Sequence, residues 1–405
     1  MKRLYTIFLL LLATFLPIVA CTTAIISGKY TVDGRPLLYK HRDTDALQNK
    51  VMYFDDGKYK YIGIVNSNDK YGKEVWGGYN STGFAIMNSA SYNLNPEQAG
   101  KDELEGVVMK LALQQCATLA DFERLLDSLP KPMYLSANFG VIDALGGAAY
   151  YETGDYSYKK FDANDPLTAP RGYLIRTNYS FSGDRNRDKG ISRYMAAEPI
   201  LYQAALSNSL SYKFLLQDVS RNLKHGLTGT NLYNNIPLNN DKPIYVPFRD
   251  FIPRYSTSSV IVVQGTKGDE PPALTTMWTI LGSPLTSVAI PVWLNKNNIY
   301  PSILIAERSE NADLCNWSLF LKKELFPISV GEGNDYINLA ALLTSNQTGI
   351  LQKIKPIENL ILENGNSLLE KWRKNEQLTS ELKDFYNQID NYVSEFYLNE
   401  LKDDK

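Results

Sequence analysis

Blocks of short apolar strands, separated and followed by helical stretches, are the feature that most constrains the fold of this chain. A first block of strands is expected within residues 21–92, and helical periodicity follows over 102–129. Strand signals resume within 139–175, a helix is expected at about 192–205, and more strands follow within 259–305. From about residue 334 the pattern is mostly helical. Strands in blocks with helices between and after them predict layered α+β packing.

Local signals add detail to these segments. Asp33-Gly34-Arg35-Pro36 is a turn between the apolar segments 24–26 and 37–39, which predicts a hairpin. Thr118 and Asp121 predict the start of a helix. The strands expected in the last block are 259–263, 276–280, 287–290 and 302–305. One apolar stripe near the C-terminus predicts a helix face that packs within the molecule: Leu378, Leu382, Phe385, Ile389, Tyr392, Val393 and Phe396.

The first 20 residues are typical of a secretory signal. Lys2 and Arg3 form a short basic start, residues 7–16 are apolar, and Ala20 is a small residue at the expected cleavage point. The apolar run is too short to favour a membrane span, and no later run reaches that length. The mature protein is therefore expected to begin near Cys21 and to be exported, either periplasmic or secreted, with no membrane span.

Composition and length limit the remaining choices. The 405 residues could form two domains; we expect a catalytic domain over 21–332 and a helical region over 333–405 that packs on it. The formal net charge of −2 gives no indication of nucleic-acid binding. Three cysteines cannot build a disulfide framework for so long a chain, and two histidines without zinc-ligand spacing argue against a histidine-rich metal site.

Cys21 has a particular chemical option if it becomes the first residue. Its own α-amino group, with an ordinary pKa of about 7.7–8.0, can take the thiol proton directly or through water. The nucleophile and its base then belong to one residue, as in threonine enzymes that use the N-terminal amine. No histidine is needed for such catalysis, and His41 and His225 are the only two in the chain.

A lipid anchor is the alternative for this cysteine. Ile18-Val19-Ala20-Cys21 also resembles a lipobox, in which the cysteine is lipidated and its amine acylated. Such an anchor is usually followed by a polar, flexible tether, whereas Cys21 runs directly into the apolar strand Thr22-Thr23-Ala24-Ile25-Ile26. This continuation favours a cysteine held in a cleft, with a lipid-anchored protein as the alternative.

The spacing of residues after Cys21 resembles a known family. Cys21-Thr22-Thr23, Thr31-Val32-Asp33-Gly34 and Arg42-Asp43-Thr44-Asp45 are similar to the start of the N-terminal-nucleophile amide hydrolases. This group includes choloylglycine hydrolases, penicillin V acylases, proteins like the acyl-CoA:6-aminopenicillanic acid acyltransferase (peptidase C45) and a dipeptidase branch. The resemblance implies that Arg42 lies close to the nucleophile, where a guanidinium favours thiolate, and that Asp45 binds its amino group. A surface ion pair is the alternative for both.

Later segments extend the resemblance to roughly residues 21–295. Residues 80–88 are similar to a turn and strand that end in an oxyanion-hole asparagine, which implies Asn88. If the match to the family is shifted by two residues, Ala90 takes the place of the oxyanion-hole asparagine, and the side-chain donor is lost. Asn178 matches a second active-site asparagine, with a turn role as the alternative. Arg193 matches an arginine that supports the site, with a solvated helix face as the alternative.

The resemblance implies a fold, a four-layer αββα sandwich of two antiparallel sheets, and an activity. Cys21 would cleave a linear amide of the N-acyl amine or N-acyl amino acid type through a thioester, without a metal or cofactor. If an amine or thiol replaced water, the same site would be an acyltransferase. A dipeptidase of the same superfamily and a non-enzymatic lipoprotein are the alternatives. The expected partner is a small-molecule amide, and a homo-oligomer is left open.

Overall fold

Two antiparallel sheets form the centre of the molecule in the computed structural model, which describes residues 20–94, 104–307, 309–375 and 381–400. Sheet A has the order β10 (Tyr173–Arg176), β1 (Ala20–Ile26), β2 (Leu37–Asp43), β12 (Thr257–Gln264), β13 (Thr276–Leu281) and β14 (Ile290–Val292). Sheet B runs β3 (Asn49–Phe54), β4 (Tyr61–Asn66), β5 (Gly78–Asn80), β6 (Ala85–Ala90), β7 (Ala137–Ile142), β8 (Ala148–Thr153) and β9 (Tyr158–Asp162). A small separate pair joins β11 (Tyr245–Pro247) to β15 (Tyr336–Asn338). Apart from Ala20, the predicted signal segment lies outside the described residues.

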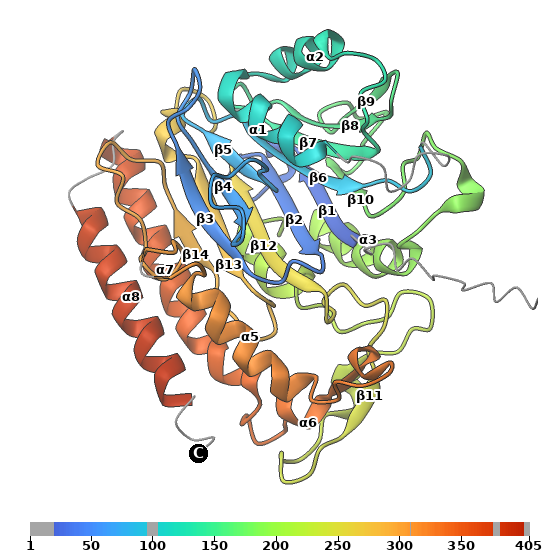
Figure 1. Ribbon diagram of the computed structural model, residues 1–405, viewed down its shortest axis with the longest axis vertical. Coiled ribbons are helices and arrows are strands. Elements are labelled where there is room, and N and C mark those ends of the chain that lie inside the picture. The colour runs from blue at the N-terminus through green and yellow to red at the C-terminus, as the bar shows by residue number, and fades with distance from the viewer. Residues whose placement is uncertain (1–19, 95–103, 308, 376–380, 401–405) are drawn as a thin grey trace, which may run out of the picture.

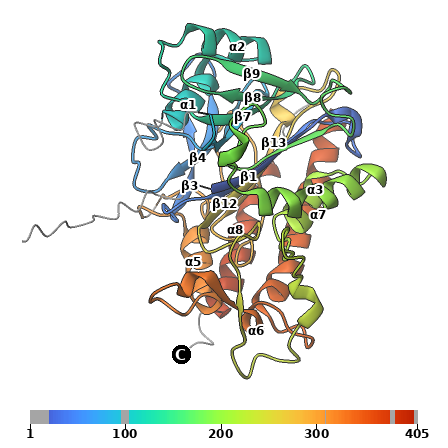
Figure 2. The ribbon, with the colours of Figure 1, turned by 90° about the vertical axis from the view of Figure 1, so that its right-hand side faces the viewer.

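Helices cover the outer faces of the two stacked sheets (Figure 1). Helices α1 (Glu105–Gln115) and α2 (Leu119–Ser128) lie on sheet B, where Phe122 packs between Phe84, Phe139 and Tyr151. On the other side, α3 (Ile191–Leu206), α4 (Tyr212–Phe214), α5 (Asp313–Leu325) and α7 (Ile350–Asn375) contact strands of sheet A. Helices α6 (Leu339–Leu342) and α8 (Glu381–Glu400) pack against α7. Figure 2 shows the resulting order of helices, sheet B, sheet A and helices. The predicted α+β sandwich of two antiparallel sheets between helical layers is confirmed.

The first hairpin has the predicted form and fixes the position of Cys21. Strands β1 and β2 pair in the antiparallel sense with Ala24 opposite Tyr39, and the turn between them uses Gly34 at a φ of 78°. A φ in that range is strained for residues with a Cβ atom, which explains glycine there. The same register places Cys21 directly opposite Arg42. The hairpin therefore brings together two residues that are 21 positions apart.

The C-terminal helices share the core of the sheets. Residues of α7 and α8 belong to the same buried cluster as sheet A, and Glu358 of α7 forms a buried ion pair with Arg221. The two guanidinium nitrogens donate to the two carboxylate oxygens at 2.5 and 2.7 Å, a bidentate geometry. The division of the chain at residues 332 and 333 stays a prediction.

Three local predictions need correction. Residues 302–305 form turns, and the Asp390 carboxylate accepts a hydrogen bond from the Ser302 N–H at 2.8 Å. Within 287–290 the only strand residue is Ile290, the first residue of β14. In the C-terminal stripe, Tyr392 is 55 % exposed while Tyr386 and Tyr397 are buried; Leu378 lies outside the described residues. Apolar runs alone do not separate buried loops from strands.

The predicted start of α2 and the predicted helix at 192–205 are confirmed. Thr118 caps α2 in a capping box with Asp121, and α3 covers the helix expected at 192–205. In the described parts of the chain, no helix is long and apolar enough to cross a membrane.

Candidate active site

Cys21 lies between the two sheets, near the start of β1. Two residues further along the strand, Thr23 bonds with the Tyr150 hydroxyl of sheet B at 2.7 Å. Because side chains alternate along a strand, Cys21 and Thr23 share the face that points to sheet B. Cys21 is only 2 % exposed in the chain that still carries Ala20. All three cysteines are free and buried.

The backbone of Cys21 is held by two of the predicted site residues. Its N–H donates to Asn178 Oδ1 at 3.0 Å, and its carbonyl oxygen accepts a hydrogen bond from Arg193. Arg193 also donates to Thr22 Oγ1 at 3.1 Å and to Asn178 Oδ1 at 2.6 Å. Asn178 in turn donates from Nδ2 to the Ala90 carbonyl at 3.0 Å. The structure thus brings Asn178 and Arg193 to Cys21, and the Ala90 carbonyl holds the amide of Asn178.

Arg42 is a third predicted residue beside Cys21. Its guanidinium donates to Asn49 Oδ1 and, at 2.9 Å, to Asn66 Oδ1, and it stacks 4.8 Å from the centroid of the Trp76 ring. Burial lowers the pKa of Arg42 to about 10. The nearby Cys21 has the opposite, smaller effect and raises this pKa. The guanidinium remains charged near neutral pH and therefore favours the thiolate form of the cysteine.

Asn88 lies on β6 and is buried, two residues before Ala90. Its Oδ1 accepts a hydrogen bond from Lys40 Nζ at 2.7 Å. Lys40 was missed by the sequence reasoning. The signal was available, since a lysine two positions before Arg42 follows three apolar residues of the same strand and shares a strand face with that arginine.

Asp45 forms no hydrogen bond with Cys21 among the described residues, against the expectation from the motif. Strand β2 ends at Asp43, and the Thr44 N–H then donates to the Ser256 carbonyl at 2.9 Å, so the chain leaves the sheet before residue 45. The Asp45 side chain is exposed, and the acceptor at the Cys21 N–H is Asn178. The sequence spacing is right for the motif, but the end of the strand decides where the carboxylate points.

Neither histidine contacts Cys21. His41 lies on the opposite face of β2, with Nε2 at 3.1 Å from Thr257 Oγ1, and burial lowers its pKa to about 4. His225 lies beside Ser192. In the part of the chain that the structure describes, no group of three His, Cys, Asp or Glu side chains could hold a metal ion. Neither histidine is therefore placed to accept the proton of the Cys21 thiol.

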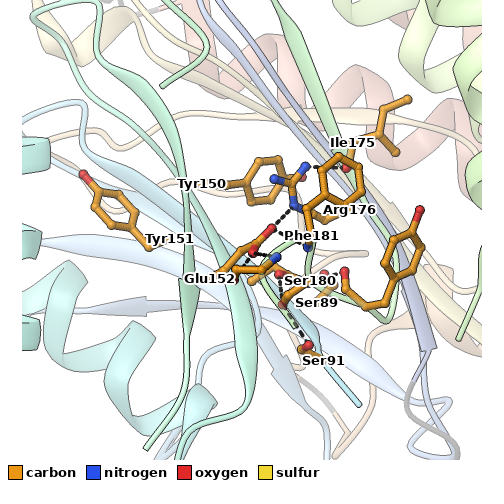
Figure 3. Close-up of polar contacts among 12 residues, drawn as sticks. Ser89, Ser91, Tyr150, Tyr151, Glu152, Ile175, Arg176, Ser180 and Phe181 are labelled. Atoms are coloured by element: carbon orange, nitrogen blue, oxygen red, sulfur yellow. Dashed lines mark hydrogen bonds and ion pairs between the residues drawn. The ribbon is translucent and has the colours of Figure 1, made fainter. Parts of the chain in front are cut away.

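A buried ion pair fixes the segment that follows Asn178 (Figure 3). Glu152 of β8 accepts from Arg176 Nε at 2.6 Å, from the Phe181 N–H at 2.9 Å and from the Ser182 N–H at 2.8 Å. The Arg176 guanidinium lies 4.0 Å from the centroid of the Phe181 ring. Glu152 thus ties a strand of sheet B to the end of β10 and to the loop after it.

Hydrogen bonds from β7 and from the segment that follows β6 reach the same loop. Ser180 Oγ donates to Asn138 Oδ1 at 2.6 Å and lies 2.8 Å from Ser91 Oγ. The Ser180 N–H donates to Asn93 Oδ1 at 2.8 Å. Together with Glu152, these contacts support the position of Asn178, which lies in the same loop after β10.

Replacing Glu152 with alanine is expected to destabilise the protein by about 3–5 kcal/mol, because Arg176 would remain buried without its carboxylate partner. Urea unfolding measures the loss. The matched control is Glu310→Ala, which removes an exposed ion pair with Lys70 and should cost at most about 1 kcal/mol. Equal losses for the two variants would contradict this account of Glu152.

No family model matches this chain, and no curated protein matches its sequence. Several solved structures are similar to it. One is an N-acylethanolamine-hydrolyzing acid amidase ortholog from Caenorhabditis elegans, 12 % identical with a TM-score of 0.33, over 47 % of this chain and 86 % of that chain. Another is a conjugated bile acid hydrolase from Clostridium perfringens, 10 % identical with a TM-score of 0.41, over 69 % of this chain and 93 % of that chain. Penicillin V acylase from Agrobacterium tumefaciens is 11 % identical with a TM-score of 0.35, over 71 % of this chain and 89 % of that chain.

These solved structures belong to the group of N-terminal-nucleophile hydrolases that the sequence resembles. Their identities to this chain are all below 25 % and their TM-scores below 0.5. The likeness therefore assigns no activity or substrate to this chain, and the chemistry has to be argued from the site.

Proposed function

We propose that this protein is an exported hydrolase that cleaves a linear amide with Cys21 as its N-terminal nucleophile. The observation that carries the proposal is the setting of Cys21. Its backbone N–H and carbonyl are held by Asn178 and Arg193, while its side chain lies between the sheets on the same side as Arg42. A structural cysteine of a core strand does not need buried charged groups at its backbone and beside its thiol.

The reaction would follow from these positions once Cys21 is the first residue. The α-amine takes the proton of the thiol, and Sγ attacks the carbonyl carbon of the amide. The carbon–nitrogen bond breaks as the proton passes to the leaving nitrogen, and an acyl thioester remains on Cys21. Water then cleaves the thioester and releases the acid. An amine or thiol in place of water would make the protein an acyltransferase.

Asn178 and Arg193 are proposed to orient the reacting residue. Asn178 Oδ1 accepts from the nitrogen that becomes the α-amine, and Arg193 holds the carbonyl of the same residue. Asn88 is proposed as a donor to the oxyanion, because an oxyanion hole needs donors fixed before the reaction. Asp45 would act only if its exposed carboxylate came closer to the new terminus.

The burial of β1 also bears on the alternative of a lipid anchor. Every residue of β1 from Ala20 to Ile26 is buried. A lipidated cysteine would need this strand to leave the sheet in order to reach a membrane. The proposal therefore favours an unmodified cysteine, and the dipeptidase alternative differs only in the amide that is cut.

The exported protein is expected to begin at an unmodified Cys21. Intact-mass measurement and mapping of its N-terminal peptide check this directly. A chain that begins at Cys21 with no added mass supports the mechanism. A diacylglycerol on the sulfur and an acylated amine would remove both nucleophile and base, and the proposal with them. Assays on dipeptides and on N-acyl amino acids then separate the two enzyme alternatives.

A further inference from the structure

Three buried cations surround Cys21, and none of them has a carboxylate partner. Lys40, Arg42 and Arg193 are each at most 3 % exposed. Burial lowers the pKa of all three, and the negative charge of the Cys21 thiolate raises it by a smaller amount. Within residues 20–94, 104–307, 309–375 and 381–400, no carboxylate lies within ion-pair distance of any of them. Buried charges are normally paired. This arrangement is suited to an anion that forms at Cys21.

Lys40 keeps one hydrogen-bond donor free beside its two contacts. Its Nζ donates to the Trp76 carbonyl at 2.6 Å and to Asn88 Oδ1 at 2.7 Å. An ammonium group has three hydrogens, so one remains after these two bonds. Lys40 lies opposite Thr23 in the β1–β2 pair and on the same strand face as Cys21. The ammonium group is therefore a neighbour of the thiol as well as of Asn88.

The hydrogen bond from Lys40 to Asn88 also determines which end of the Asn88 amide can bond to another group. Lysine donates hydrogen bonds and accepts none, so the atom facing Nζ must be the amide oxygen. Among the described residues, Asn88 Nδ2 donates to no partner, although the residue is 4 % exposed. Lys40 thus keeps the donor end of Asn88 free.

We propose that Lys40 is a positioning residue that provides the counter-charge for the Cys21 thiolate and fixes the orientation of Asn88. The inference rests on the proposed function of Cys21 as the nucleophile. Besides Cys21, the charged groups that act on Lys40 are Arg42 on β2 and Glu105 at the start of α1. Burial lowers the pKa of Lys40 to about 7, while the Cys21 thiolate and Glu105 raise it. Formation of the thiolate therefore favours the ammonium form that stabilises it.

The test is the pH dependence of Cys21 alkylation by iodoacetamide, read by mass mapping on the purified exported protein. In Lys40→Met the midpoint of the pH–rate profile should rise by about 1 unit or more, because an opposite charge at short range has been removed. At pH values below both midpoints, alkylation should slow about tenfold. Lys40→Arg should keep the midpoint near that of the wild type. The matched control is Lys29→Met, which changes an exposed lysine and should shift nothing.

Two outcomes would overturn the inference. One is a midpoint in Lys40→Met equal to that of the wild type; the other is an equal shift in Lys40→Met and Lys40→Arg, which would exclude charge as the cause. If Lys40→Met does not fold, Lys40→Gln provides the neutral variant, since its amide can still donate to the Trp76 carbonyl. Because alkylation needs no substrate, this test is independent of the amide assay. Amide hydrolysis that survives in Cys21→Ala would contradict the proposed function and leave the alkylation result intact.

Discussion

Replacing Cys21 with alanine is expected to lower amide hydrolysis by about 10⁴-fold or more, because the nucleophile is removed. The fold should remain, since the change removes one sulfur atom and leaves the backbone bonds to Asn178 and Arg193 in place. Cys21→Ser keeps the geometry and should also lose most of the rate. A hydroxyl is a far weaker acid than a thiol of pKa about 8.5, so an α-amine activates it poorly. Initial rates and circular dichroism on the same preparations check both statements.

The other two cysteines provide matched controls. Burial raises the pKa of Cys116 to about 12 and that of Cys315 to about 11, so both remain thiols near neutral pH. Cys116→Ala and Cys315→Ala should therefore keep nearly full turnover. A loss of turnover in either variant as large as that in Cys21→Ala would contradict the assignment of the nucleophile.

Replacing Asn178 with alanine is expected to lower kcat by about 100-fold, because a small misplacement of reacting groups has effects of that size. The change removes the acceptor for both the Cys21 N–H and Arg193. Asn178→Asp keeps an acceptor oxygen in the same place and should retain more of the rate than Asn178→Ala. Turnover should be compared at temperatures where each variant is fully folded, since unsatisfied buried groups also cost about 1–3 kcal/mol of stability.

Asp45→Asn is the matched control for Asn178. The side chain is exposed and outside the contacts of Cys21, so the structure predicts little change in turnover, as for most surface substitutions. A loss in Asp45→Asn as large as that in Asn178→Ala would show that the carboxylate, and not the amide, orients the amine of Cys21.

Much of the fold was predictable because it depends on local patterns. The turn at Asp33 to Pro36 and the flanking apolar residues predict the hairpin, and its register then follows from the pairing of β1 with β2. Thr118 and Asp121 predict the start of α2 for the same reason, since a capping box is a local motif. The layered sandwich follows once each strand and helix has to bury an apolar face.

The site was predictable only in part, because it depends on where strands end and on which face a side chain lies. Arg42, Asn178 and Arg193 are brought to Cys21 as the motif implies. Asp45 is not, since β2 ends two residues earlier. Lys40 belongs to no motif recognised in the sequence, and its role depends on contacts between two sheets. Such contacts join residues that sequence spacing does not relate.

The most direct test of the central claim is to titrate activity against alkylation of Cys21. The purified protein is treated with increasing amounts of iodoacetamide, and the labelled fraction of each cysteine is measured by mass mapping beside the rate of amide hydrolysis. Label is expected on Cys21 before Cys116 and Cys315, and activity is expected to decline in proportion to the labelling of Cys21. Full activity after complete modification of Cys21 would contradict the account.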